Sequence, residues 1–178
     1  MLRDVVGAFD DATDKAFEHL RGKGPADRIF YTASAIGDFG LLWVVFGLLR
    51  ALRGNKVDEA AALRAIIATG IESVLVNVVL KSFVRRGRPL EQRDHPLPLR
   101  QPLSSSFPSG HATAAFCGAT LLSDRDRLGP VYFAAASVVA LSRIYVRIHH
   151  ASDVVGGVVV GLVLGQIGKR VFPLRHPR

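Results

Sequence analysis

Residues 60–84 read AAALRAIIATGIESVLVNVVLKSFV, an apolar run that only a few polar side chains interrupt. A helix needs about 20 predominantly apolar residues to cross the hydrocarbon core of a bilayer, and this run is long enough. It lacks the alternation of apolar and polar residues that is typical of a strand in a membrane barrel. Because only helices and closed barrels keep their backbone groups paired inside a bilayer, the stretch predicts a membrane-spanning helix in an all-helical fold.

Four further apolar runs extend this prediction to the rest of the chain. They cover 38–52, 112–122, 131–148 and 154–172. We therefore expect an all-α, polytopic membrane helical bundle with five transmembrane helices, or six if one more segment crosses. The 178 residues suffice for a single membrane-embedded domain, 1–178, and not for two.

The N-terminal segment, 1–28, has a different pattern. Apolar residues such as Val5, Phe9 and Phe17 recur at helical spacing among many charged side chains. This pattern predicts an amphipathic helix that lies in the membrane interface. The segment has no uninterrupted apolar core, so we do not expect a cleavable signal peptide.

A second apolar stretch begins at Ile29 and is interrupted by Gly37-Asp38-Phe39-Gly40. Glycines at such an interruption favour a break between helices. We expect the break to separate a short interfacial helix from a first spanning helix that starts near Asp38.

The composition and charge indicate which partners the chain binds. The formal net charge is +8, and 49% of the residues are hydrophobic. In a soluble protein this charge would suggest nucleic acid. Here the cations flank apolar runs, so the membrane and an anionic lipid phosphate are the expected partners, and nucleic acid is not. Cys117 is the only cysteine, which excludes an intramolecular disulfide.

Three short motifs beside the apolar runs contain residue types that handle phosphate. They are Lys81-x6-Arg88-Pro89, Phe107-Pro108-Ser109-Gly110-His111 and Ser142-Arg143-x5-His149-x3-Asp153. Lys81, Arg88 and Arg143 can neutralise the negative oxygens that make a phosphate ester resist attack. Ser109 and the backbone N–H of Gly110 add donors at a helix start. Residues 85–107, rich in Arg and Pro, cannot continue a membrane helix and are expected to form an active-site loop.

Two histidines in these motifs supply the reactive groups. Asp153 follows His149 by one helical turn, so its carboxylate can accept from one ring nitrogen and leave the other free to attack phosphorus. His111 can protonate the departing alkoxide and then activate water. The set is complete for phosphoryl transfer with no metal and no cofactor. Ser109 and Asp153 are also favoured helix N-cap residues, a role compatible with catalysis.

The motifs resemble the signature of the type 2 phosphatidic acid phosphatase superfamily, which contains membrane lipid phosphatases and is related to bacterial acid phosphatases and vanadium haloperoxidases. The resemblance covers Lys81 to Asp153 directly. It implies a lipid phosphatase with His149 as nucleophile, His111 as acid and Asp153 as the carboxylate that orients the nucleophile. The phosphate-binding residues that it implies are Lys81, Arg88, Ser109, Gly110 and Arg143. The expected enzyme removes phosphate from a lipid phosphate or pyrophosphate through a phosphohistidine.

Two other functions fit parts of the pattern. A lipid-phosphate binding or translocating protein would keep the fold without turnover, but it should have lost His111 or His149, and both are present. A vanadium-dependent haloperoxidase could hold an oxyanion in the same cage, but the apolar runs argue against it. The motifs recognise only phosphate, so several substrates remain open. They are phosphatidic acid, phosphatidylglycerophosphate, and polyprenyl phosphates or pyrophosphates, including phosphosugars carried on a polyprenyl lipid.

With five crossings, the three motifs meet on one side of the membrane. The loop at 52–58, the turn at Asp124 and the basic tail (Lys169, Arg170, Arg175, Arg178) then fall on the other side. The positive-inside rule assigns those cations to the cytoplasm. We therefore expect a multi-pass protein of the inner (plasma) membrane with its active site on the extracytoplasmic face.

Several residues outside the motifs have more than one interpretation. Gly157, Gly161 and Gly165 form a small-residue face, which favours helix packing within the monomer over a homodimer contact. Polar residues inside apolar runs are expected to form helix-to-helix hydrogen bonds rather than a transport path; they are Asp38, Glu72 and Asn77. Cations and a histidine beside the motifs are expected to contact headgroups or the interface; they are Arg85, Arg86, Arg147 and His150. Arg85 or Arg86 could also contact a second phosphate.

Overall fold

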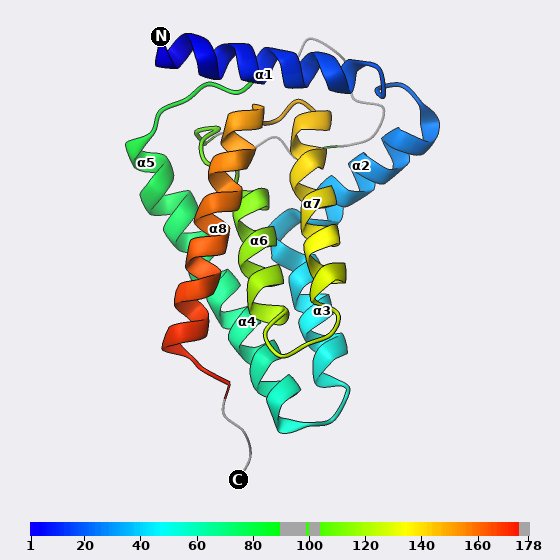
Figure 1. The fold of residues 1–178 in the computed structure, drawn as a ribbon, viewed down its shortest axis with the longest axis vertical. Coiled ribbons are helices and arrows are strands. Elements are labelled where there is room, and N and C mark those ends of the chain that lie inside the picture. Colours follow the sequence, from blue (N-terminus) through cyan, green and yellow to red (C-terminus); the bar gives the residue numbers. More distant parts are fainter. Residues whose placement is uncertain (90–98, 100–103, 175–178) are drawn as a thin grey trace.

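The computed structural model describes residues 1–89, 99 and 104–174, and every regular element in these ranges is a helix (Figure 1). The elements, in chain order, are α1 (Leu2–Glu18), α2 (Gly24–Ile36), η1 (Asp38–Gly40), α3 (Leu41–Ala51), α4 (Lys56–Val74), η2 (Leu75–Leu80), α5 (Lys81–Phe83), α6 (Gly110–Leu122), α7 (Gly129–Tyr145) and α8 (Ala151–Val171). The all-helical prediction is confirmed for the described residues.

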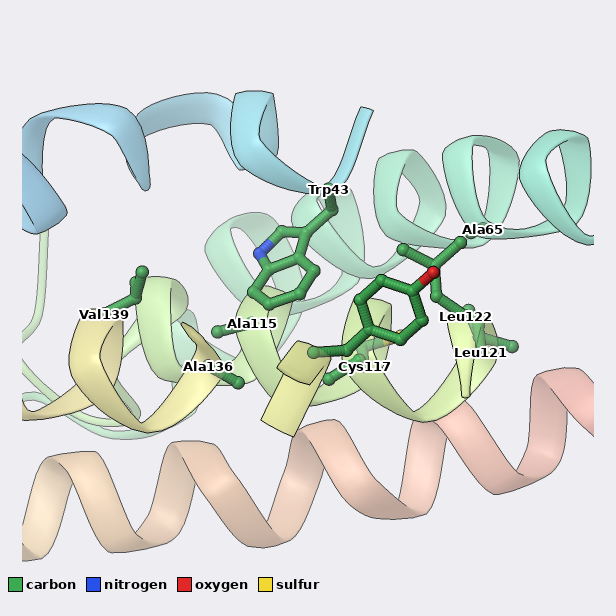
Figure 2. Packing of buried hydrophobic residues seen from close by; sticks show 10 residues of the cluster. Trp43, Ala65, Ala115, Cys117, Leu121, Leu122, Ala136 and Val139 are labelled. Atoms are coloured by element: carbon green, nitrogen blue, oxygen red, sulfur yellow. The ribbon is translucent and has the colours of Figure 1, made fainter. Parts of the chain in front are cut away.

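Helix α6 is the centre of the bundle and packs against α3, α4, α7 and α8. The ring of Trp43 on α3 lies over Gly118, where a Cβ atom would come within 2.7 Å of the indole. Around this contact a core forms from Ala115 and Cys117 of α6 and Ala136 of α7 (Figure 2). An apolar helix enclosed on all sides is typical of a buried core helix, and α6 is of this kind.

The membrane-spanning prediction is confirmed in part. Among the described residues, Lys56–Phe83 and Ala151–Val171 are long and apolar enough to cross a membrane, and Gly24–Ile36 with Asp38–Ala51 makes a third span if this pair, bent by 64°, is counted as one. Helices α6 and α7 have 13 and 17 residues. At 1.5 Å per residue they extend for about 20 and 26 Å, less than a hydrocarbon core of about 30 Å.

Helix α8 has two contrasting faces. Gly157, Gly161 and Gly165 are buried against α6, and a Cβ at Gly161 would come within 2.4 Å of the Thr113 carbonyl oxygen. Large apolar side chains are exposed on the opposite face; they are Val155, Val159, Val163 and Ile167. The glycine face is therefore covered within the monomer, as the favoured interpretation expects, while the exposed valines suit a lipid environment.

The N-terminal helix α1 lies across one end of the bundle, as Figure 1 shows. Asp14 and Glu18 of α1 form ion pairs with Arg147, which precedes α8. Arg147 therefore joins α1 to the bundle through these ion pairs. The sequence had predicted that Arg147 contacts headgroups. Helix α2 begins at Gly24, four residues before the expected segment boundary, because Pro25 in its first turn suits a helix start.

The opposite end of the bundle contains buried ion pairs. Arg50 Nε lies 2.6 Å from Asp58 Oδ1, and Arg64 Nη2 lies 2.9 Å from Asp124 Oδ2. Arg64 also donates to the carbonyl oxygen of Phe172, beyond the end of α8. The loop after α3, the turn after α6 and the end of α8 thus lie together, as the count of crossings predicts. Arg175 and Arg178 lie outside the described residues.

Candidate active site

The three motifs meet at the end of the bundle that α1 covers. Their segments are joined through the backbone: the N–H of Ser109 donates to the carbonyl oxygen of Asp153 at 3.0 Å, and the N–H of His149 donates to the carbonyl oxygen of Arg143 at 3.1 Å. These bonds connect the start of α6, the end of α7 and the first turn of α8. The helix termini therefore fix the relative positions of the motif side chains.

His149 and Asp153 form the buried centre of the site. The His149 side chain is 2% exposed, and Asp153 is fully buried. His149 Nδ1 lies 3.7 Å from Asp153 Oδ2, longer than a hydrogen bond but close enough to orient the ring. Asp153 Oδ2 also accepts from the N–H of His150 at 2.9 Å. Asp153 therefore caps α8 and faces the histidine, as the sequence analysis allows.

Arg88 lies on the other side of the His149 ring. Its Nη1 is 3.3 Å from His149 Nε2 and 3.0 Å from the carbonyl oxygen of Ile148. Its Nη2 donates to the carbonyl oxygens of Ser104 and Ser105. These contacts hold the guanidinium beside the ring nitrogen that points away from Asp153. An anion bound in front of Nε2 would therefore meet a fixed cation.

Several buried donors at this end make no hydrogen bond with the described part of the chain. They are Arg143 Nε and Nη2, Arg88 Nε and Ser109 Oγ. Arg143 is held from the other side because its Nη1 donates to Ser34 Oγ of α2. Buried donors of this kind are costly unless a ligand accepts from them. Guanidinium and hydroxyl groups together suit phosphate oxygens.

A cavity of about 420 Å³ joins the remaining motif residues. Lys81, Gly110, His111 and His149 all line it. Lys81 Nζ lies 3.4 Å from Ser104 Oγ, at the far end of the long helix that begins with α4. Gly110 allows a close approach, since a Cβ there would lie 3.3 Å from Asn77 Oδ1. All eight predicted site residues thus lie together in the described structure.

His111 has a partner that the sequence analysis did not assign. Its Nε2 lies 3.0 Å from Asp38 Oδ1, in the break between α2 and α3. Asp38 was expected to form a structural helix-to-helix hydrogen bond. Its contact is indeed with another helix, and its partner there is a predicted catalytic residue. Gly37 makes this possible, because a Cβ there would come within 3.0 Å of the His111 ring. The glycines around Asp38 were the feature of the sequence from which this contact could have been predicted.

A second unassigned contact links α1 to the carboxylate of Asp153, a predicted site residue. Arg86 Nη1 donates to Asp153 Oδ1 at 2.6 Å, and its Nη2 donates to Asp10 Oδ2 at 2.7 Å. Asp10 also accepts from the backbone N–H of Ser152 at 2.8 Å. Arg86 was expected to contact headgroups, and that expectation is wrong, because two buried carboxylates hold it.

The environment of His149 keeps its ring neutral. Burial, together with the nearby charges of Arg143 and Arg88, lowers the pKa of His149 from 6.5 to about 3, against the opposite effect of Asp153. A neutral ring has a free electron pair on one nitrogen, which a nucleophile requires. The site therefore holds a neutral imidazole between a carboxylate and fixed cations.

Comparison with known proteins identifies the class of this site. Residues 61–177 match the PAP2 superfamily model. The chain is 34% identical to decaprenylphosphoryl-5-phosphoribose phosphatase from Mycobacterium tuberculosis over 145 residues. The aligned region covers 76% of each chain. It is 27% identical over 150 residues to undecaprenyl-diphosphatase from Bacillus subtilis, covering 84% of this chain and 75% of that protein.

A solved structure agrees with these matches. The transmembrane PAP2-type phosphatidylglycerolphosphate phosphatase from Bacillus subtilis superposes with a TM-score of 0.71 at 26% identity, over 94% of this chain and 86% of that one. The chain belongs to the PAP2 superfamily. Within that superfamily it is a lipid phosphatase, which confirms the activity expected from the three motifs.

Proposed function

We propose that the chain hydrolyses a lipid phosphate monoester or pyrophosphate through a phosphohistidine at His149, with no metal ion. One observation carries this mechanism: His149 is held between Asp153 and Arg88, with its Nε2 on the Arg88 side and beside the cavity. Lys81, Arg88 and Arg143 supply the positive charge that a metal would otherwise bring to the phosphate oxygens.

In the first step, Nε2 of neutral His149 attacks phosphorus, and the bond from phosphorus to the lipid oxygen breaks. Asp153 accepts the Nδ1 proton in a hydrogen bond and stabilises the positive charge that develops on the ring. His111, which Asp38 orients, gives a proton to the departing lipid oxygen. The lipid alcohol, or the lipid monophosphate from a pyrophosphate, then leaves.

In the second step, water attacks the phosphorus of the phosphohistidine. His111 now takes a proton from that water, the phosphorus–nitrogen bond breaks, and its electron pair returns to His149. Phosphate leaves, and both histidines regain their starting protonation states. Arg143 and Ser109 can donate to the phosphate oxygens in both steps through their open donors.

The relatives support a polyprenyl-linked substrate. Two of them are a decaprenylphosphoryl-5-phosphoribose phosphatase and an undecaprenyl-diphosphatase. A phosphate-release assay in detergent, with a chelator and no added metal, should compare polyprenyl phosphate, polyprenyl pyrophosphate, a polyprenyl-linked phosphosugar, phosphatidic acid and phosphatidylglycerophosphate. We expect release from at least one polyprenyl lipid. Activity that appears only with added Mg²⁺ would contradict the metal-free mechanism.

We further propose five spanning helices in the inner (plasma) membrane, formed by α3, α4 with η2 and α5, α6, α7 and α8, with the active site on the extracytoplasmic face. The joined ends of α3, α6 and α8 would then face the cytoplasm, where Lys169 and Arg170 belong by the positive-inside rule. The test is labelling of single cysteines in intact cells with an impermeant maleimide, in a Cys117→Ala background. A cysteine at Arg85 should react, and one at Arg125 should react only after lysis; the reverse pattern would invert the topology.

A further inference from the structure

The catalytic cavity has a second polar wall that phosphate transfer does not use. Glu72 and Thr69, both on α4, line the cavity with His111 and His149. Glu72 is 3% exposed and Thr69 is 6% exposed. Neither oxygen of the Glu72 carboxylate, nor Thr69 Oγ1, forms a hydrogen bond with any described residue.

Such a carboxylate needs an explanation. Removing a carboxyl group from water without a partner costs several kcal/mol, and α4 is part of a helix apolar enough to span a membrane. The sequence analysis expects Glu72 to bond to another helix. In the described part of the chain, no hydrogen bond or ion pair of this kind reaches it. The Glu72 side chain lines the cavity, so a ligand bound there can supply the missing donors.

The position of Glu72 indicates which part of a substrate would meet it. Nine residues separate Glu72 from Lys81, which corresponds to about 13 Å along a helix. The cavity of about 420 Å³ connects the two ends and is within the range of small-ligand sites. If the leaving phosphate lies near Lys81 and His149, the next group of the substrate extends toward Glu72 and Thr69.

Residues of the break between α2 and α3 line this part of the cavity. Gly40 packs against Thr69, and Gly37, Phe39 and Gly40 line the cavity opposite α4. Phe39 is 82% exposed beside this wall. An exposed aromatic ring next to the cavity suits contact with an acyl or prenyl tail. The polar wall at Glu72, the phosphate site and this exposed ring therefore share one cavity.

We propose that Glu72 and Thr69 bind the hydroxyl groups of a sugar or polyol that links the leaving phosphate to the lipid tail. Hydroxyls donate to a carboxylate, and a pair of neighbouring hydroxyls can engage both of its oxygens. A plain polyprenyl phosphate or a diacylglycerol phosphate has no donor at this point and would leave the carboxylate unpaired. This inference rests on the proposed function and narrows its substrate to phosphosugar or phosphopolyol lipids.

The experiment compares two substrates in detergent: a polyprenyl-linked phosphoribose and polyprenyl phosphate. The measured quantity is the ratio of their kcat/KM values. The wild-type enzyme should favour the phosphosugar. Glu72→Gln should lower that ratio by about 10-fold and Glu72→Leu by up to about 100-fold, as expected for lost hydrogen bonds to a charged group. Thr69→Val should lower it by a smaller factor.

Glu59→Gln is the matched control. Glu59 is on the same helix, but it is exposed and pairs only with exposed Lys56 among the described residues. This variant should keep the wild-type ratio. If Glu72→Leu does not fold, Glu72→Gln and Thr69→Val still test the assignment, with ribose 5-phosphate and inorganic phosphate as competing soluble inhibitors. Ribose 5-phosphate should lose potency relative to phosphate in both variants.

Two outcomes would overturn the assignment. One is a wild-type enzyme without preference for the phosphosugar, and the other is an unchanged ratio in the Glu72 variants, whether the two kcat/KM values stay the same or fall equally. An enzyme that releases phosphate from no lipid would instead contradict the proposed function. The two failures are therefore distinguishable in one assay.

Discussion

The two ends of the helical bundle both bury charged side chains, but they differ in how these charges are paired. At the end remote from α1, Arg50 pairs with Asp58, Arg53 with Asp126 and Arg64 with Asp124, at distances of 2.6, 2.9 and 2.9 Å. Arg50 and Arg64 also donate to carbonyl oxygens at the end of α6. Each of these arginines has a carboxylate partner within the protein, although Arg64 Nε makes no bond to the described residues, and the pairs hold helix ends together.

At the catalytic end, several donor atoms of the motif residues keep no partner among the described residues. Arg143 keeps Nε and Nη2 without a bond to the described residues, and Ser109 Oγ is open as well. Buried charge alone therefore does not indicate a ligand site. A ligand site is indicated where donors without a partner converge on a nucleophile. Variants at the catalytic end should therefore change the rate, and variants at the end remote from α1 should change stability.

The largest expected effect is that of His149→Ala at the catalytic end. The covalent step needs the Nε2 electron pair, so turnover and the acid-labile phosphoenzyme should both disappear. Rapid quenching with a labelled lipid phosphate measures the intermediate, and a thermal melt checks folding. Exposed His19→Ala should behave as wild type. Labelling that persists in His149→Ala would place the nucleophile elsewhere.

His111→Ala should have the next largest effect, and it should depend on the leaving group. A lipid alcohol needs a proton to leave, so its hydrolysis should slow by about 10²- to 10⁴-fold. An activated aryl phosphate needs no such proton, so its hydrolysis should slow far less. Asp38→Asn should show the same bias in weaker form, because Asp38 contacts the His111 ring. Equal losses on both substrates would argue against an acid role.

Arg88→Gln should change both the rate and its pH dependence. Loss of one donor to the developing charge should lower kcat by about 10²- to 10³-fold. Arg88 also helps to hold the pKa of His149 below its usual value. Without this cation the pKa rises, so the ring becomes protonated and unreactive at a higher pH.

The acid limb of the kcat/KM profile should therefore move to higher pH in Arg88→Gln. A profile on a soluble aryl phosphate measures this shift. The matched control is Arg85→Gln, three residues away and exposed, which should leave the acid limb in place. An acid limb that moves to lower pH in Arg88→Gln would contradict the assigned electrostatics.

Arg86→Gln should have a smaller effect on the rate, because Arg86 acts through Asp153. The tie from Asp10 to Asp153 would break, and the carboxylate would be less firmly placed beside His149. We expect kcat to fall by about 10-fold, a value typical of lost support to a reacting group. Asp10→Asn should resemble it, and Arg86→Lys should restore part of the rate. A change in KM alone would contradict a positioning role.

The sequence predicted that the proposed reacting residues lie together because their motifs are local. Ser109, Gly110 and His111 are adjacent, and His149 precedes Asp153 by one helical turn, so short-range geometry was enough. The same reasoning could not find Arg86, whose partner Asp10 lies 76 residues away in sequence. It also gave Asp38 a structural role, since the contact with His111 depends on how η1 packs beside α6.

The helix count shows a similar limit. The run that became α6 is apolar because other helices surround it, and hydropathy does not distinguish that burial from contact with lipid. The long run that ends at Lys81 and the valines of α8 gave the clearer signal, because these helices keep exposed apolar side chains. Apolar sequence therefore predicted helices reliably and their lipid exposure less well.

Arg50→Leu should have the smallest effect on the rate and a large one on stability. It removes the buried arginine partner of Asp58, which keeps a bond from Asn55, and frees the carbonyl oxygen of Leu122, so the free energy of unfolding should fall by about 3–5 kcal/mol. The kcat of the folded fraction should stay at the wild-type value, because no motif residue lies at this end. Lys56→Gln, which breaks an exposed pair, should cost at most about 1 kcal/mol. Thermal melts in detergent measure the stability of each variant. The kcat normalised to the folded fraction measures its rate. A fall in normalised kcat for Arg50→Leu would show that the two ends are coupled, and the division between a binding end and a structural end would then fail.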